Sequence, residues 1–146
     1  MTRYFDASAL VKRYVREQAA VSVRRLLKAD LGASSRLSEV EVASALIRRA
    51  REGAFTEEER DRALASLEDD FAALILVECT PDIIAGARAL LLRHRLRAGD
   101  AVQLASCLYL QRELGQTVPF VAFDERLTRA ASDEGLTVVP SSPRRR

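Results

Sequence analysis

The sequence predicts an α/β domain in which a central, mostly parallel sheet is flanked by helices. Short runs of β-branched and aromatic residues alternate along the chain with longer segments of helical periodicity, which is the pattern of parallel βα units. The length of 146 residues is that of one domain. Hydrophobic residues make up 48% and charged residues 30% of the chain, which fits a globular core and argues against wholesale disorder.

The first half of the chain is expected to alternate short strands with helices. Ser38 and Glu41 stand in the register of a capping box, which favours a helix that starts at Ser38. Thr56 precedes three glutamates, and acidic residues in a first turn complement the helix dipole. Gly32 and Gly53 are expected to end helices. Strands are therefore predicted at residues 3–5, 33–37 and 74–77, and helices from residue 7 and at 19–29, 38–53 and 56–73.

The second half continues the same alternation. Pro81 suits the first position of a helix. Residues 101–110 are apolar on nearly all sides, so this helix is expected at the centre of the domain. The remaining predictions are a helix at 81–94, a strand at 118–123, a short helix ending near 134 and a strand at 136–139. Residues 1–140 are thus read as one domain, and residues 141–146 as a disordered basic tail that ends in Arg144, Arg145 and Arg146.

The charge balance argues against a strongly basic surface for nucleic acid. The 23 Lys and Arg residues exceed the 21 Asp and Glu residues by two, and without Arg144 to Arg146 the count is 20 against 21. Aromatic residues are only 5% and Trp is absent, so a stacking platform for single strands is not expected. Any phosphate binding must therefore be local, or depend on a cation from outside.

Several classes of protein are excluded by what the sequence lacks. Cys79 and Cys107 lie in apolar runs, and we interpret them as reduced core thiols rather than a disulfide framework or a zinc site. No P-loop or Gly-rich dinucleotide fingerprint is present. The first residues lack a signal-peptide pattern, and no stretch approaches the roughly 18 apolar residues of a membrane span. We therefore expect a cytoplasmic protein.

Acidic residues stand at the ends of predicted strands or at the starts of helices. Asp6 and Asp124 each follow a strand, Asp100 starts the central helix, and Glu39 and Glu41 open the helix after the second strand. Ligands of open α/β sheets bind outside the carboxyl ends of the strands, so these acids are expected to converge there. Converging carboxylates repel one another and favour a hard cation such as Mg²⁺ or Mn²⁺. Simple helix capping remains the alternative for the three aspartates.

Four segments carry a resemblance to the PIN-domain family, and within it to the VapC-like toxins of type II toxin–antitoxin pairs. Their order and spacing match the family from about residue 2 to residue 139, and together they are more specific than any one of them. The resemblance implies a three-layer PIN-like fold. The segments are YFDASAL at 4–10, LSEVEVASAL at 37–46, LRAGDAVQLAS at 96–106 and FVAFDERL at 120–127.

The resemblance further implies an endoribonuclease that depends on Mg²⁺, with Mn²⁺ as a possible substitute. Carried over to this sequence, Asp6 and Asp100 would hold metal directly, and Glu41 and Asp124 would complete one or two ion positions. Ser8 matches a hydroxyl position that supports the first acid. The implied partners are an RNA substrate, a second copy of the chain and a small VapB-like antitoxin that contacts the helices between Ser38 and about Ala73.

Two alternatives remain open at this point. Helical periodicity places Glu39 on the apolar face of its helix and Glu41 about 200° away, whereas the family motif selects Glu41, which we prefer. The alternative function is a catalytically inactive PIN-like module that binds RNA or protein. Arg97 is a candidate contact for a substrate phosphate, with a solvated helix end as the competing interpretation.

Overall fold

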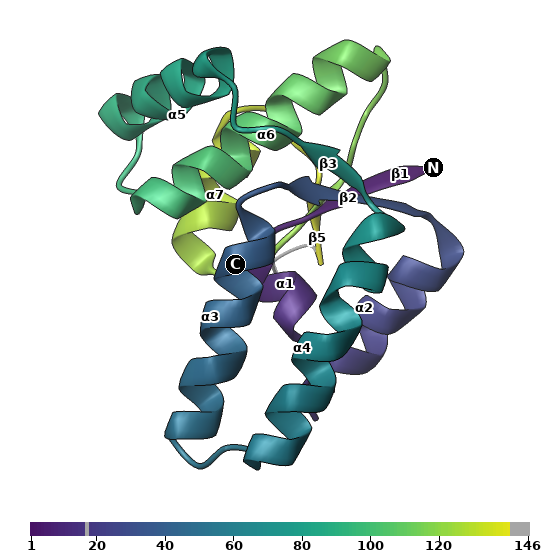
Figure 1. Cartoon of the computed structure of the whole chain (residues 1–146). Coiled ribbons are helices and arrows are strands. Elements are labelled where there is room, and N and C mark those ends of the chain that lie inside the picture. Colours follow the sequence, from purple (N-terminus) through teal and green to yellow (C-terminus); the bar gives the residue numbers. More distant parts are fainter. Residues whose placement is uncertain (17, 141–146) are drawn as a thin grey trace, which may run out of the picture.

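The computed structural model describes residues 1–16 and 18–140, and its helices lie on both faces of one sheet (Figure 1). The strands have the order β3-β2-β1-β4-β5, and every pairing between them is parallel, which confirms the predicted α/β fold. The strands are β1 (Thr2–Phe5), β2 (Leu31–Ser35), β3 (Ile75–Val77), β4 (Phe120–Val121) and β5 (Val138–Val139). The helices are α1 (Ala7–Val11), α2 (Gln18–Ala29), α3 (Ser38–Arg51), α4 (Glu57–Ala72), α5 (Pro81–Arg93), α6 (Ala98–Leu114) and α7 (Glu125–Asp133).

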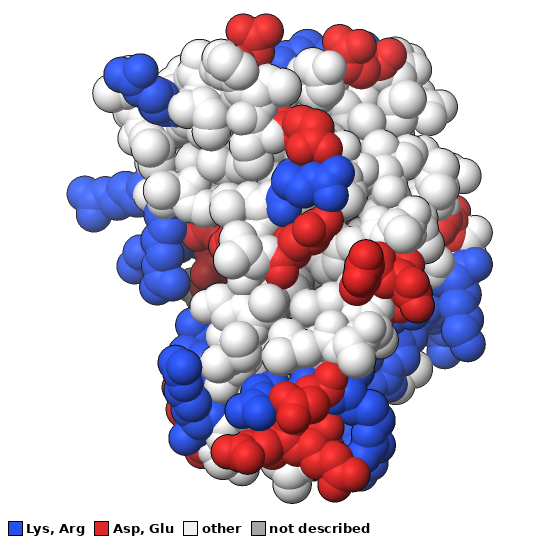
Figure 2. All heavy atoms as spheres, in the orientation of Figure 1, with Lys and Arg blue, Asp and Glu red and all other residues white. Residues whose placement is uncertain are grey.

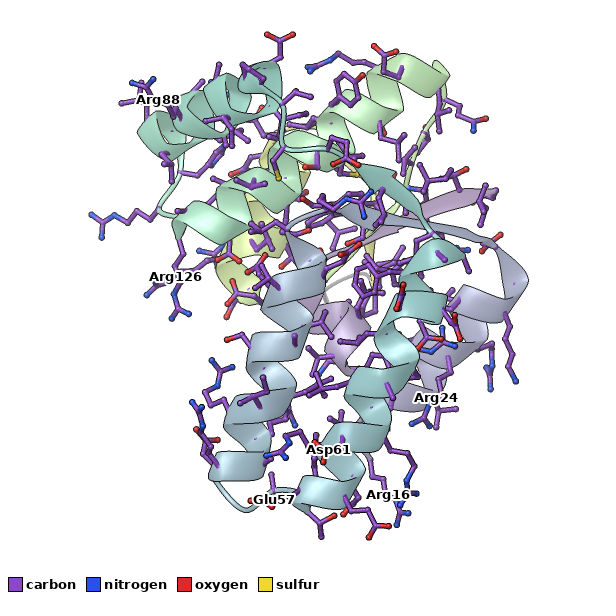
Figure 3. All side chains as sticks on the ribbon, viewed as in Figure 1. Arg16, Arg24, Glu57, Asp61, Arg88 and Arg126 are labelled. Atoms are coloured by element: carbon purple, nitrogen blue, oxygen red, sulfur yellow. The ribbon has the colours of Figure 1, made fainter. Side chains whose placement is uncertain are left out.

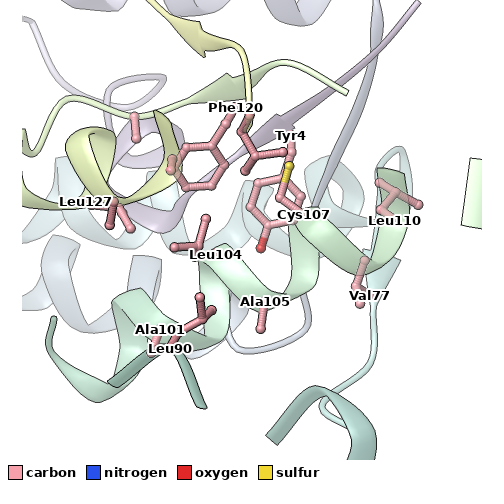
Figure 4. Packing of buried hydrophobic residues seen from close by; sticks show 14 of the residues in the cluster. Tyr4, Val77, Leu90, Ala101, Leu104, Ala105, Cys107, Leu110, Phe120 and Leu127 are labelled. Carbon is pink, nitrogen blue, oxygen red and sulfur yellow. The ribbon is translucent and has the colours of Figure 1, made fainter. Parts of the chain in front are cut away.

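Successive side chains of the strands point to opposite faces of the sheet, and a hydrophobic core lies on each face. Tyr4 and Phe120 point to the face covered by α5, α6 and α7, where their rings stack with centroids 5.6 Å apart. Phe5 and Val121 point to the opposite face, which α1 to α4 cover. Leu104 of α6 is fully buried beside Tyr4 and Phe120 (Figure 4). The expected central position of α6 is therefore confirmed.

The topology creates a natural binding position between β1 and β4. From β1 the chain first builds outward to β2 and β3, and later returns to add β4 and β5 on the other side of β1. Connections therefore diverge at the carboxyl ends of β1 and β4, which is where open α/β sheets bind ligands. The amide of Asp6 donates a hydrogen bond to the carbonyl of Val121 at 3.1 Å, which ties the two strand ends together.

Local sequence signals were correct at some element ends and wrong at others. Thr56 caps α4 in a capping box with Glu59, and Pro81 occupies the start of α5, as predicted. Gly32 does not end a helix but lies within β2, where a Cβ atom would stand 2.7 Å from a methyl group of Leu74. A side chain at this position would force the side chains of Leu74 and Leu27 to move, so glycine allows their close packing against the strand.

The two cysteines differ in their exposure to solvent. Cys107 is buried as predicted, but Cys79 is exposed, because β3 ends at Val77 and Cys79 lies in the loop that leads to α5. The expected basic tail, residues 141–146, lies outside the described residues. No helix in the described part of the chain has the length and apolar character needed to cross a membrane.

Candidate active site at the carboxyl edge of the sheet

Asp6 is the buried centre of the candidate site. It directly follows β1, and its side chain is 3% exposed. One carboxylate oxygen accepts a hydrogen bond from the amide of Ala9 at 2.8 Å, so Asp6 caps α1. The hydroxyl of Ser8 lies 3.0 and 2.9 Å from the two oxygens and donates to the carboxylate. Capping and membership of an acidic cluster are thus compatible at Asp6.

Asp100 and Asp124 reach the same edge from two other helices. Asp124 caps α7, with one carboxylate oxygen accepting from the amide of Leu127 at 2.9 Å. Asp100 is not a cap, because the capping position of α6 is Arg97 and Asp100 lies within the first helical turn. Asp100 is therefore not the capping residue, although a hydrogen bond from the backbone of Arg97 reaches its carboxyl and lowers its pKa. The side chain also lies near the positive end of the helix dipole.

Glu41 enters the cluster from α3 and lies against the start of α6. Its Oε1 accepts a hydrogen bond from Nε2 of Gln103 at 2.9 Å. A Cβ atom built on Gly99 would stand 2.9 Å from Oε2 of Glu41, so the glycine leaves room for the carboxylate. Glu39 is exposed and pairs with Arg36 at the surface. Glu41, rather than Glu39, is therefore the acid that faces the cluster.

The four acids are linked by mutual repulsion. The pKa of Asp6 is raised to about 7 by burial, against hydrogen bonds from Ala9 and Ser8 that lower it, and the charges of Asp100 and Glu41 add to the rise. Burial also raises the pKa of Glu41, and the charge of Asp100 contributes. The pKa of Asp100 is raised by burial and then by the charge of Asp124. Four elements remote in sequence thus share one electrostatic site.

A buried polar network lies behind Glu41. Gln103 donates to the hydroxyl of Ser38 at 2.9 Å as well as to Glu41, and its carbonyl oxygen accepts from the hydroxyl of Tyr4 at 2.6 Å. Ser38 and Ser34 are joined at 2.7 Å, and Ser34 donates to the carbonyl of Phe5 at 2.7 Å. Because the one hydroxyl hydrogen of Ser34 is used on that carbonyl, Ser38 must donate to Ser34.

This network explains why the expected capping box at Ser38 does not form. The capping position of α3 is Leu37, with no side-chain bond, and Ser38 is fully buried as the first helical residue. Its hydroxyl and the carboxylate of Glu41 bind Gln103 rather than the backbone of the first turn. Sequence reasoning also missed Gln103, whose signal is a lone amide on an otherwise apolar central helix, because buried amides need partners.

The donor set is made of oxygen atoms, as a hard divalent cation requires. In the residues that the structure describes, however, no three Asp, Glu, His or Cys side chains surround one point closely enough to hold a metal ion. The carboxylates interact at a distance rather than through shared ligand geometry. A bound cation would therefore draw them together or be reached through water, and Mg²⁺ commonly retains several of its waters.

Comparisons with known proteins identify the family of this chain. The family model described as PIN domain matches residues 3–133. Ribonuclease VapC49 of Mycobacterium tuberculosis is 39% identical over 140 residues, which cover 94% of each chain. Ribonuclease VapC46 of the same species is 34% identical over 140 residues, covering 95% of this chain and 97% of the relative.

Solved structures share the fold at low sequence identity. The crystal structure of VapBC2 from Rickettsia felis, bound to a DNA fragment from their promoter, has a TM-score of 0.63 at 11% identity, covering 94% of this chain and 97% of that one. VapBC-1 from nontypeable Haemophilus influenzae has a TM-score of 0.60 at 14% identity and covers 94% and 96%. With the family match spanning most of its length, this chain belongs to the PIN domain family.

Proposed function

We propose that this protein is a divalent-metal-dependent endoribonuclease that acts as the toxin of a toxin–antitoxin pair. The observation that carries the proposal is the gathering of Asp6, Glu41, Asp100 and Asp124 at the carboxyl edge of the sheet, where neighbouring acids add to the raised pKa of Asp6, Glu41 and Asp100. Relatives at 34–39% identity are named ribonucleases, which supports RNA as the substrate. An inactive binding module would have no need to maintain this mutual repulsion.

The residues of the site fit a hard divalent cation in their chemistry. Asp6 and Asp100 are assigned to hold Mg²⁺ or Mn²⁺ directly, with Glu41 and Asp124 completing one or two ion positions. When bound there, such a cation would supply an activated water for attack on the phosphodiester and would neutralise charge on the leaving oxygen. A cation would also relieve the repulsion that raises the pKa of Asp6, so it favours the ionised form of this carboxylate.

The surrounding side chains of the chain orient these acids. Ser8 donates to the carboxylate of Asp6, which holds the side chain and favours its ionised form. Gln103 fixes the carboxylate of Glu41 from the buried side. Tyr4 remains a proton donor to Gln103 because burial raises the pKa of its hydroxyl further above its ordinary value. The orientation of Glu41 is thereby determined by the core.

The antitoxin is proposed to occupy a groove beside α4. A hollow of about 770 Å³ is walled by apolar side chains of α4 and of the β3 region, with Arg36 and Glu39 at its rim. The wall includes Leu64, Leu67 and Phe71. Such a groove suits an amphipathic segment of a partner protein, and several solved structural neighbours are toxin–antitoxin complexes. The helices between Ser38 and Ala73 were the expected contact region.

A second copy of the chain is proposed to cover α5. Leu92 is 90% exposed, and Ile84 and Leu91 are also exposed on this helix. Exposed leucines gathered on one helix favour a protein interface. The resemblance to VapC-like toxins implies a homodimer, and α5 is the surface that suits it.

The nuclease is tested by incubating purified protein with RNA in Mg²⁺ or Mn²⁺, with and without EDTA. Wild type should cut RNA internally only when metal is present, and folded Asp6→Asn protein should not cut. Mapped cut sites across tRNA, rRNA and mRNA would define the target. The toxin is tested by expression in bacteria: growth should stop, and coexpression of a small protein encoded beside the gene should restore it.

A further inference from the structure

A hollow lined by arginines lies between α7 and the segment that joins α5 to α6. It has a volume of about 380 Å³. Four arginines line it together with His94 and one acid, Asp133; the arginines are Arg93, Arg95, Arg126 and Arg129. We call it the arginine groove. We propose that it binds phosphates of the RNA strand next to the phosphodiester that is cleaved. This inference rests on the proposed function.

Two arginines of the arginine groove are close in sequence to acids of the candidate site. Arg126 lies two residues beyond Asp124 on α7, and Arg95 lies five residues before Asp100. Between them, Arg97 is close enough to Asp100 for its charge to lower the pKa of that carboxyl. Arg126 points outward on the side of the molecule on which α6 begins (Figure 3). Figure 2 shows basic side chains gathered at the same edge, beside recessed acidic ones.

Two guanidinium groups of the groove are available for a ligand. Arg93 pairs with Glu134 at 2.9 Å, and Arg129 pairs with Glu125 at 3.2 Å across one turn of α7. Arg95 and Arg126 make no ion pair within residues 1–16 and 18–140. Guanidinium groups bind phosphate oxygens through paired hydrogen bonds, which makes arginine well suited to this ligand.

The arginine on the opposite flank of the acidic site is paired within the chain. There, Arg36 is held by two carboxylates at once, those of Glu39 and Glu78. The guanidinium group of Arg36 is therefore already occupied by carboxylates of its own chain. A strand with one phosphate at the acids would find unpaired guanidinium groups on the α7 side, at Arg95 and Arg126, but not at Arg36. The chain as a whole is nearly neutral, so phosphate binding needs a local group of cations, and the arginine groove is such a group.

The test measures RNA binding separately from cleavage. A short fluorescein-labelled single-stranded RNA is titrated with Asp6→Asn protein over a series of salt concentrations, and affinity is read by anisotropy. When Arg95→Ala and Arg126→Ala are added to the Asp6→Asn protein, RNA binding should weaken. The slope of the logarithm of the association constant against the logarithm of the salt concentration should become shallower by about 1.4, or about 0.7 for each lost phosphate contact. Arg16→Ala is the matched control, because Arg16 is exposed at the other end of the molecule (Figure 3). This control should leave both affinity and slope unchanged.

The outcomes separate this inference from the proposed function. If wild type cleaves RNA and the double variant binds RNA with unchanged affinity and slope, the arginine groove does not bind RNA phosphates. The proposed nuclease function is then unaffected. If wild type neither binds nor cleaves RNA, the proposed function fails and the groove fails with it. If the double variant binds RNA normally but no longer copurifies with the antitoxin, the groove is a protein-docking surface, which also overturns the inference.

Discussion

Gln103 donates a hydrogen bond from Nε2 to Oε1 of Glu41 at 2.9 Å, while its own carbonyl oxygen accepts from Tyr4 at 2.6 Å. The amide therefore has one orientation, because the carboxylate of Glu41 and the hydroxyl of Ser38, whose hydrogen is used on Ser34, can only accept from its Nε2. Gln103 is buried, whereas the carboxylate of Glu41 is half-buried at the site. A buried amide with a fixed orientation, that of Gln103, thus donates to the carboxylate of Glu41, a candidate metal ligand.

The first prediction concerns Gln103→Leu. Loss of the amide leaves Tyr4 and Glu41 without their partner, at a cost of about 1–3 kcal/mol in the free energy of unfolding. Because Glu41 is no longer oriented, the Mg²⁺ concentration for half-maximal RNA cleavage should rise by about 10- to 100-fold. Denaturant titration measures the first effect, and cleavage rates over a Mg²⁺ series measure the second.

Gln111→Leu is the matched control on the same helix. Gln111 accepts a hydrogen bond from the amide of Val118 at 3.1 Å, away from the acids. Its loss should lower the free energy of unfolding without moving the Mg²⁺ requirement. An equal shift of the Mg²⁺ requirement in both variants would show that Gln103 acts through general stability and does not position Glu41.

The raised pKa of Asp6 predicts how stability depends on pH without metal. Below the ordinary value of 3.8, the carboxyl is protonated in both the folded and the unfolded chain. Between about 4 and 7 the folded chain keeps the proton and the unfolded chain loses it, so the free energy of unfolding falls as pH rises. The total fall from this group is at most about 4 kcal/mol. Denaturant titrations at several pH values in EDTA measure it.

Asp6→Asn isolates the contribution of this one group. The variant cannot lose a proton at Asn, so its stability should decline less than that of wild type between pH 4 and pH 7. Above pH 7 the variant should therefore be the more stable protein in EDTA. Parallel stability curves for the two proteins would refute the raised pKa of Asp6.

The choice between Glu41 and Glu39 has a direct test. Glu41→Gln replaces a carboxylate that faces Asp6 and Asp100, so cleavage should be largely lost. Glu39→Gln removes a surface ion pair with Arg36 and should change stability by less than about 1 kcal/mol and leave cleavage intact. RNA cleavage by the two variants, prepared side by side, decides the matter, and the opposite pattern would make Glu39 the functional acid.

The proposed homodimer is tested at Leu92. The side chain is 90% exposed in the single chain, so Leu92→Glu should leave the fold of each chain unchanged. A charge buried in an apolar interface is costly, and the variant should therefore run as a monomer where wild type is a dimer. Light scattering coupled to size-exclusion chromatography measures both masses. Identical dimers of the two proteins would exclude α5 as the interface.

The order of the elements could be predicted from sequence because local patterns determine it. Periodicity identified each strand and helix, and Thr56 and Pro81 marked helix starts correctly. The convergence of the acids also followed from chain topology, since Asp6 and Asp124 come after neighbouring parallel strands. These inferences needed only nearest-neighbour chemistry and the rule that parallel strands end at one edge.

Features that depend on long-range contacts could not be predicted. Ser38 has the sequence signature of a cap, yet a partner 65 residues away takes its hydroxyl. A helical wheel selected Glu39 because it assumes one buried face, whereas the first turn of α3 also meets α6 through Glu41 and Gln103. Gly32 is needed for packing against Leu74 rather than for a helix end. In each case tertiary packing overrode the local signal.

The most direct test of the acidic site is calorimetric titration of the metal-free protein with Mn²⁺. Wild type should bind Mn²⁺ with measurable heat, and folded Asp6→Asn and Asp100→Asn proteins should lose most of that binding. Glu39→Gln, in which the four clustered acids remain, should bind like wild type. If wild type does not bind Mn²⁺, or if the Asp6→Asn and Asp100→Asn proteins bind it as tightly as wild type does, the assignment of these carboxylates to a metal site is contradicted.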